Sequence, residues 1–157
     1  KGAKKRFKWP KDPVPEGKTP KEPDCPAALM AGTYICDKRR LLLKNSKEGF
    51  KPKSKKFHQI LEGDVSKKSF KRLHRYRYSP AAAYGNNEVH LHPTKPRRLT
   101  VRESMMLQSV PNEYFLPTNM TLTDKFKTIG NGVPVKLASA VAGALAKFMK
   151  GVRYEKI

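Results

Sequence analysis

Apolar residues recur at helical spacing in one long stretch near the C-terminal end of the chain. From Leu137 to Met149 they stand three or four positions apart and make a broad apolar stripe. Val133-Pro134 puts a proline at a first-turn position, where its missing N–H costs no hydrogen bond, and Gly151 is a suitable stop. The pattern predicts an amphipathic helix from about Val133 to Gly151, whose apolar face needs another body to pack on.

A second, shorter helix is predicted to start at Thr100. Thr100 and Glu103 stand three residues apart. This is the spacing of a capping box, in which each side chain accepts a backbone N–H at the start of the helix. Val101 and Met105 share one face of this helix, and Pro111 ends it.

Strand-like patterns occur earlier in the chain. In residues 27–43, β-branched and aromatic residues on both sides of the charged segment 37–40 predict a strand hairpin whose tip carries three positive charges. Residues 69–92 predict further strands, interrupted at Pro80 and at Gly85-Asn86-Asn87. The fold class predicted is therefore α+β, with a small mixed β region followed by two helices.

Basic residues dominate the composition. The 157 residues include 34 Lys and Arg against 13 Asp and Glu, which gives a formal net charge of +21. Residues 1–77 hold 23 of the basic residues and 8 of the acidic ones, so the N-terminal half is the predicted electrostatic footprint. So much like charge favours a polyanion as partner. Residues 1–26 also carry six prolines, which predicts an extended basic arm. Phe7 and Trp9 are candidates to anchor this arm, but a loosely held surface segment is the favoured interpretation.

Two patterns suggest catalysis or metal binding, and both have simpler explanations. Cys25 lies in the proline-rich arm, without a placed partner that would lower its pKa as a nucleophile requires. His90 and His92 would share one face of a strand, but a third metal ligand is not evident. We therefore expect no catalytic residue and no metal ligand in this chain. No apolar run approaches the ~20 residues of a membrane span. For the two cysteines, Cys25 and Cys36, a reduced pair is a simpler interpretation than a disulfide.

Short motifs follow one another in a fixed order in the second half of the chain. They are Arg98-Leu99-Thr100-Val101-Arg102-Glu103, Leu107-Gln108, and Ile129-Gly130-Asn131-Gly132-Val133-Pro134. His92-Pro93 precedes them, and Pro111 and Tyr114-Phe115 lie between them. In order and spacing the set resembles the last two sequence blocks of the DNA (cytosine-5)-methyltransferase family, over about residues 70–150.

The resemblance implies an enzyme that flips a cytosine out of DNA, attacks it with a cysteine and transfers a methyl group from S-adenosylmethionine to C5. It also implies that Asn131, Gly132 and Val133 line the cofactor pocket, and that the last helix packs on a Rossmann-like cofactor domain. Glycines at 130 and 132 let backbone approach a ligand closely, and free N–H groups of the next helix would attract polar groups. Without the resemblance, an ordinary turn into a helix would be the simpler interpretation.

The resemblance divides the charged residues into two groups. The family's late block is chiefly a scaffold, so structural ion pairing is favoured there over contact with DNA phosphates. The scaffold residues are Arg98, Thr100, Arg102 and Glu103. The target-recognition region precedes this block, and there arginine is preferred for bidentate contact with guanine. The candidates for DNA contact are Arg39, Arg40, Arg72, Arg75 and Arg77. Taken singly, each is more readily explained as a phosphate contact or a solvated charge.

The family's other motifs do not occur in this sequence: Phe-x-Gly-x-Gly, Pro-Cys, Glu-Asn-Val and Gln-x-Arg-x-Arg. Cys25-Pro26 has the reverse order, and Leu73 stands where the Gln before Arg75-Tyr76-Arg77 should be. We expect three parts: an arm at 1–26, a β-rich target-recognition region at 27–96, and the late motifs with a C-terminal helix at 97–157. Together they would form the C-terminal part of such an enzyme, either as a split subunit or as a fragment of a longer chain.

The expected partners are double-stranded DNA and a catalytic N-terminal part or subunit, in the cytoplasm of a bacterium or a phage host, and no membrane. The alternative is a non-catalytic basic DNA-binding module derived from such an enzyme. A basic RNA-binding or ribosomal protein would share the charge, since charge does not tell RNA from DNA. It would not account for the ordered motifs.

Overall fold

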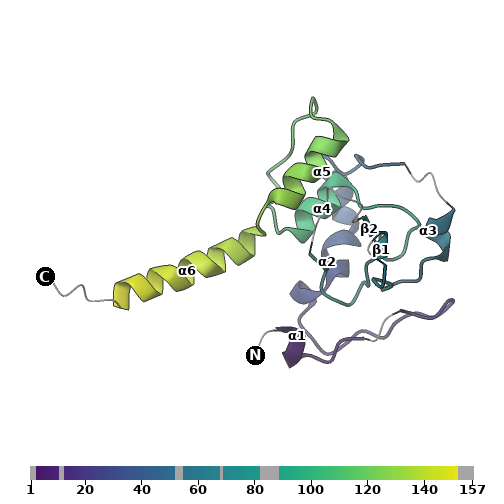
Figure 1. Ribbon diagram of the computed structural model, residues 1–157, viewed down its shortest axis with the longest axis horizontal. Helices are drawn as coiled ribbons and strands as arrows, with labels where there is room; N and C mark the ends of the chain where they lie inside the picture. Colours follow the sequence, from purple (N-terminus) through teal and green to yellow (C-terminus); the bar gives the residue numbers. More distant parts are fainter. Residues whose placement is uncertain (1–2, 11–12, 52–54, 68, 82–88, 152–157) are drawn as a thin grey trace, which may run out of the picture.

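A body of short helices and loops carries one long helix that projects away from it (Figure 1). The computed structural model describes residues 3–10, 13–51, 55–67, 69–81 and 89–151. The helices are α1 (Ala3–Arg6), α2 (Ala31–Ile35), α3 (Lys56–Gln59), α4 (Val101–Leu107), α5 (Leu122–Asn131) and α6 (Val135–Gly151), with 3-10 turns η1 (Ala27–Leu29) and η2 (Lys38–Leu42). The strands are β1 (Lys71–Arg72) and β2 (His90–Leu91). The predicted break at Gly85–Asn87 lies outside the described residues.

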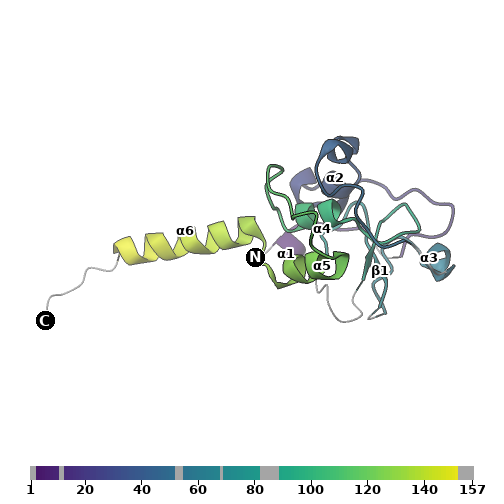
Figure 2. The same cartoon turned by 90° about the horizontal axis from the view of Figure 1, so that it is seen from above.

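Helix α4 lies between α2 and α5 and contributes to both apolar clusters of the body (Figures 1 and 2). One cluster consists of Val101, Met105, Leu116 and Ile129. The other consists of Ala31, Ile35, Leu73 and Leu99, with Tyr34 and Leu107 packed against it. Because α4 separates the two clusters, it holds the earlier part of the chain and the later part in one body.

The capping box predicted at the start of α4 is confirmed. The Glu103 N–H donates to the Thr100 hydroxyl oxygen at 3.3 Å, and the Thr100 N–H donates to Glu103 Oε2 at 2.8 Å. The helix ends at Leu107, with Gln108 as its C-cap. The start of this helix therefore follows from local sequence, whereas its end comes four residues before the predicted stop at Pro111.

The hairpin predicted for residues 27–43 is wrong. This segment forms η1, α2 and η2, and its residues pair with no strand. Ala31 and Ile35 are both buried, and their spacing of four places them on one face of α2. The β-branched composition of the segment concealed this helical period. Asp37 starts η2 by accepting the Arg39 N–H at 2.9 Å, where the hairpin tip was expected.

A close backbone approach fixes α2 against the chain around Arg75. The Gly32 N–H donates to the Arg75 carbonyl at 2.8 Å, and the Ala31 N–H donates to the Arg77 carbonyl at 2.7 Å. A Cβ at Gly32 would lie 2.6 Å from the Arg75 oxygen. Glycine is therefore required at this position, and a side chain would push α2 away from the body.

The predicted β-rich character of residues 27–96 is also wrong for the described residues. The sheet has two parallel strands, in which Lys71 pairs with His90 and Arg72 with Leu91. Leu91 forms a further antiparallel bridge with Arg98. Strands were correctly expected in this part of the chain, but Arg72 ends β1, so the residues after it pack through loops. The mixture of helix and strand is nevertheless that of an α+β fold.

The N-terminal arm is anchored to the body through aromatic contacts. The Trp9 ring packs edge-on against Tyr78 and Phe7, with centroid separations of 5.3 and 6.2 Å. Further along, Val14 is buried, and its N–H donates to the Glu62 carbonyl at 2.8 Å. The favoured prediction, a loosely held surface segment, is therefore wrong here, and the alternative of anchoring by Phe7 and Trp9 is what the structure shows.

Helix α5 was not predicted. Its signal was present in the sequence, because the Thr121 hydroxyl accepts the Asp124 N–H at 3.1 Å and donates to the Asp124 carboxylate at 2.7 Å. The helix runs through Asn131, so the turn expected from Gly130 begins only at Gly132. The later part of the chain therefore has three helices where two were expected.

Helix α6 confirms the predicted amphipathic helix, and Figure 2 shows that it extends well clear of the body. All its side chains are exposed, including Leu137, Val141, Leu145 and Phe148 at 55–69%. By length and composition alone, the stretch Leu122–Gly151 is apolar enough to cross a membrane. The expectation that no segment approaches a membrane span is therefore wrong on that criterion. An apolar face of this size calls for a partner.

Candidate functional site

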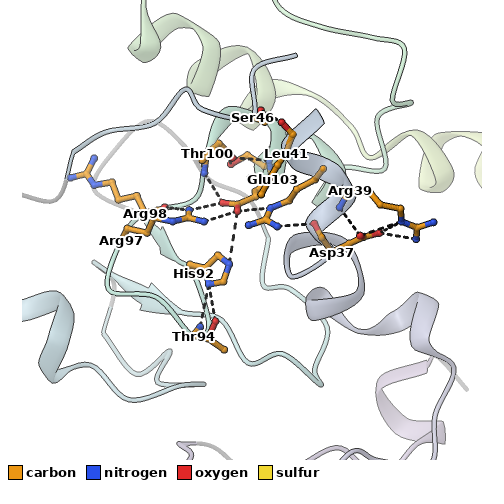
Figure 3. Close-up of polar contacts among 12 residues, drawn as sticks. Asp37, Arg39, Leu41, Ser46, His92, Thr94, Arg97, Arg98, Thr100 and Glu103 are labelled. Carbon is orange, nitrogen blue, oxygen red and sulfur yellow. Dashed lines mark hydrogen bonds and ion pairs between the residues drawn. The ribbon is translucent and has the colours of Figure 1, made fainter. Parts of the chain in front are cut away.

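A buried carboxylate is the centre of the polar contacts around α4 (Figure 3). Glu103 is fully buried, and its oxygens accept from Arg40 Nε at 2.8 Å and from Arg97 at 2.7 and 2.8 Å. His92 Nε2 lies 3.9 Å from Glu103 Oε1. The carboxylate thus joins three segments: η2, the loop after β2 and the start of α4. All of these contacts are to residues of this chain.

The protonation of this cluster follows from its surroundings. Burial on its own raises the pKa of Glu103, but hydrogen bonds and charge from Arg97, together with the Thr100 amide, lower that pKa to about 2. Burial lowers the pKa of His92 to about 4, against the opposing effect of Glu103. At neutral pH Glu103 is therefore charged and His92 is neutral.

Acidification should destabilise the protein between about pH 6.5 and 4. The unfolded chain takes up a proton on His92 near pH 6.5, whereas the folded chain does so only near pH 4. In that window the unfolded state binds more protons, so stability falls as the pH falls, by at most about 3 kcal/mol for this group. Buried His74, whose pKa burial also lowers, adds to the loss.

Urea unfolding at pH 7 and pH 4.5 measures this loss. In His92→Asn the side-chain oxygen replaces Nδ1, which accepts the Thr94 N–H at 3.2 Å. The variant should lose distinctly less stability than the wild type between the two pH values. An equal loss in both proteins would contradict the assignment to His92.

The two scaffold arginines differ in environment. Arg102 is fully buried, and its guanidinium donates to the carbonyls of Lys44 at 2.9 Å and Tyr114 at 2.8 Å. Arg98 is half-buried and lies over the rings of Phe50 and Phe70, 5.1 and 5.8 Å from their centroids. Arg102 thus holds two loops to α4, while Arg98 covers aromatic surface.

Two arginines predicted to contact DNA are buried in the protein. Arg40 bonds to Glu103 and to the Asp37 carbonyl. Arg72 donates to backbone carbonyls from two separate segments, α3 with its C-cap and the loop after β2, and all these bonds are buried or partly buried. Its acceptors are the carbonyls of Phe57, Ile60, His92 and Lys95. Contact of Arg40 or Arg72 with DNA would require these bonds to break.

The other three candidate arginines are more accessible. The Arg39 side chain is 89% exposed and pairs with Asp37 at 2.8 Å. Arg75 forms a bidentate ion pair with Glu62, in which Nε and Nη2 donate to the two carboxylate oxygens at 3.0 and 2.8 Å. Arg77 is half-buried and lies over the Tyr78 ring at 5.5 Å. Arg39 is the candidate best placed to reach a ligand.

The three residues predicted to bind cofactor lie together at the α5–α6 junction. Asn131 ends α5, Gly132 is its C-cap, and both are exposed along with Val133. The amides expected to be free at the start of α6 are occupied. The Val135 N–H donates to the Gln108 carbonyl, and the Lys136 N–H donates to the Ser109 hydroxyl. A ligand at this turn would therefore meet its side chains and the backbone of residues 131–133.

Sequence patterns missed a second polar cluster, which holds α5 in place. Lys125 is 2% exposed and pairs with Glu48. Asn45 donates to Glu48 at 2.8 Å and exchanges two hydrogen bonds with the backbone of Leu116. Asn45 has φ 64°, a left-handed value that asparagine tolerates well. A lysine within an apolar helical stripe was the available signal.

The residues considered for metal binding or nucleophilic catalysis lack the surroundings for either role. Within the described residues, no group of three or more His, Cys, Asp or Glu side chains is placed to hold a metal ion. Cys25 is a free thiol, and its pKa is raised by burial and then by the nearby Asp24 and Glu22 carboxylates. The thiolate form is therefore disfavoured there.

Comparison with known proteins places this chain in a family. Residues 19–147 match the family model for C-5 cytosine-specific DNA methylases. The chain is similar to the type II methyltransferase M.NmeDI of Neisseria meningitidis serogroup C, with 53% identity over 114 residues, covering 71% of this chain and 27% of that protein. It is also similar to the putative type II methyltransferase M.OihORF3336P of Oceanobacillus iheyensis, with 45% identity over 62 residues, covering 40% of this chain and 13% of that protein.

The chain is also similar to part of a plant protein. The rice DNA (cytosine-5)-methyltransferase CMT1 is 36% identical over 66 residues, covering 42% of this chain and 6% of the plant protein. The chain belongs to the C-5 cytosine-specific DNA methylase family. It spans about a quarter of the length of M.NmeDI, the bacterial relative with the longest shared stretch of those named here.

Proposed function

We propose that this chain is the C-terminal part of a DNA cytosine-5 methyltransferase, containing the target-recognition region and the last two motifs. The observation that carries the proposal is the unpartnered apolar face of α6, which begins directly after the Asn131–Val133 turn. A helix so exposed has little reason to be apolar unless another body covers it. We propose a Rossmann-like cofactor domain as that body.

Asn131, Gly132 and Val133 would form one wall of an S-adenosylmethionine site shared with that domain. All three are exposed, and Gly132 has no side chain to cover the backbone of the turn. The turn therefore suits close approach of a ligand to backbone. When bound, S-adenosylmethionine supplies the methyl group, and this chain's residues would bind and orient it. The cysteine nucleophile would come from the catalytic part.

Double-stranded DNA is the proposed substrate, recognised through residues before Arg97. Exposed Arg39 is the first candidate for contact with DNA, and Arg77 and Arg75 rank after it. Surrounding lysines would bind phosphates. The type II names of the bacterial relatives lead us to propose a role in a restriction–modification system, in the cytoplasm at the nucleoid. The direct test is transfer of a labelled methyl group to DNA by this chain combined with the catalytic part.

The affinity of the chain for duplex DNA should fall steeply with salt. Each phosphate contact lowers log K by ~0.9 per decade of salt concentration. Arg39→Ala should reduce the slope by about one contact. Lys147→Ala, on exposed α6 outside the footprint, should leave the slope unchanged. Fluorescence anisotropy of a labelled duplex measures all three proteins, and a flat salt dependence would contradict the footprint.

A further inference from the structure

Gln108, the C-cap residue of α4, forms hydrogen bonds on both sides of the turn between α5 and α6. The Gln108 side-chain amide donates to the Ile129 carbonyl at 3.2 Å, on the upstream side of the turn. The Gln108 backbone carbonyl accepts the Val135 N–H at 3.0 Å, on the downstream side. Gln108 is 7% exposed. One buried residue is thus hydrogen-bonded to both ends of the segment 129–135.

Ser109 completes the grip on the start of α6. Its hydroxyl donates to the Gln108 carbonyl at 2.7 Å and accepts the Lys136 N–H at 3.0 Å. Its φ of 53° turns the chain back at this point, in a region that non-glycine residues seldom adopt. Two successive amides of α6 therefore end on two successive residues after α4. The direction in which α6 leaves the body is set there.

The hydrogen bonds of Gln108 and Ser109 flank a segment, residues 131–133, whose own side chains are exposed. Asn131, Gly132 and Val133 are exposed, and the rest of α6 is exposed too. A buried amide costs free energy unless its hydrogen bonds are made. An apolar residue would fill the space beside α5 without that cost. The side chain at Gln108 is therefore explained by what its amide holds, which is the end of α5 just before the turn.

We propose that Gln108 is a positioning residue, which holds the Asn131–Val133 turn in the conformation that receives the cofactor. This inference rests on the proposed function of that turn. The same helix carries Glu103 near its start, five residues before its C-cap Gln108. α4 would in this way connect the scaffold of the recognition region to the cofactor turn.

The test uses Gln108→Met, which keeps the length of the side chain and the backbone carbonyl but removes the amide donor. Its matched control is Asn119→Leu, which likewise replaces a side-chain amide by an apolar side chain, at an exposed position between α4 and α5. In the chain combined with its catalytic part, Gln108→Met should raise KM for S-adenosylmethionine roughly five- to tenfold, as loss of one buried hydrogen bond predicts. KM for DNA and kcat should change less than twofold, and the control should match the wild type.

Hydrogen exchange on the full chain supplies a second readout that needs no activity. In Gln108→Met the hydrogen-bonded amides of Gly132, Val135 and Lys136 should exchange about tenfold faster, while those of α4 keep their wild-type rates. Unchanged exchange and unchanged KM in an active pair would overturn the positioning role alone. A general loss of protection, with both KM values raised alike, would reduce Gln108 to a core residue and also overturn it. No transfer by the wild-type pair would overturn the proposed function and the cofactor role with it.

Discussion

Glu103→Gln is expected to destabilise the chain by about 3–5 kcal/mol, the usual cost of removing one partner from a buried ion pair. Glu103 and Arg40 are both buried, and Arg40 Nε bonds to the carboxylate at 2.8 Å. A neutral amide leaves the Arg40 charge inside the protein without its counter-ion. It also turns one acceptor oxygen into a donor, which faces Arg97 or the Thr100 amide that closes the capping box.

Glu113→Gln is the matched control, because Glu113 is exposed and the chemical change is identical. Surface substitutions of this kind usually change stability by less than about 0.5 kcal/mol. Equilibrium unfolding in urea, with the slope compared between proteins, gives the difference in free energy of unfolding. A loss below about 1 kcal/mol in Glu103→Gln would show that this carboxylate is not the centre of the scaffold.

Elements whose signals are local could be predicted from the sequence. The capping box at Thr100 and the apolar stripe of α6 each depend on residues within a few turns, and both are confirmed. Helix α5 had an equally local signal at Thr121 and Asp124. The glycines at 130 and 132 instead indicated a turn in the same part of the sequence. The strand interpretation of residues 27–43 failed because composition favoured β structure while the spacing of Ala31 and Ile35 is helical.

Features that depend on distant partners could not be predicted. Arg40 and Glu103 are 63 positions apart, and the sequence around each residue does not indicate that the two form an ion pair. The same holds for Arg72, whose acceptors come from two segments, and for Asn45, which bonds to Leu116 across 71 positions. Sequence alone ranks such arginines by charge and type. Burial then separates Arg40 and Arg72 from exposed Arg39.

The late motifs also acquire a physical connection that spacing does not supply. Gln108 and Ile129 are 21 positions apart and meet through one hydrogen bond. The motif at Leu107-Gln108 and the motif at Ile129–Pro134 therefore belong to a single structural unit in the folded chain.

The apolar face of α6 should decide whether the chain joins a catalytic part. Val141 is 59% exposed, so Val141→Asp leaves the body of the chain intact while placing a charge in the stripe. Ser139→Asp puts the same charge on the opposite face, since successive helical residues turn by about 100°. With both parts at limiting concentration, Val141→Asp should reduce methyl transfer at least a hundredfold and Ser139→Asp less than threefold. Equal effects of the two variants would argue against docking through this face.

The most direct test of the whole account is transfer of a labelled methyl group from S-adenosylmethionine to C5 of cytosine in duplex DNA. The assay compares this chain alone, the polypeptide carrying the Phe-x-Gly-x-Gly and Pro-Cys motifs alone, and the two combined. We predict no transfer above background by either part and clear transfer by the pair. Transfer by this chain alone would contradict the assignment of the nucleophile to a separate part. A pair that binds DNA but transfers no methyl group would favour a non-catalytic DNA-binding module.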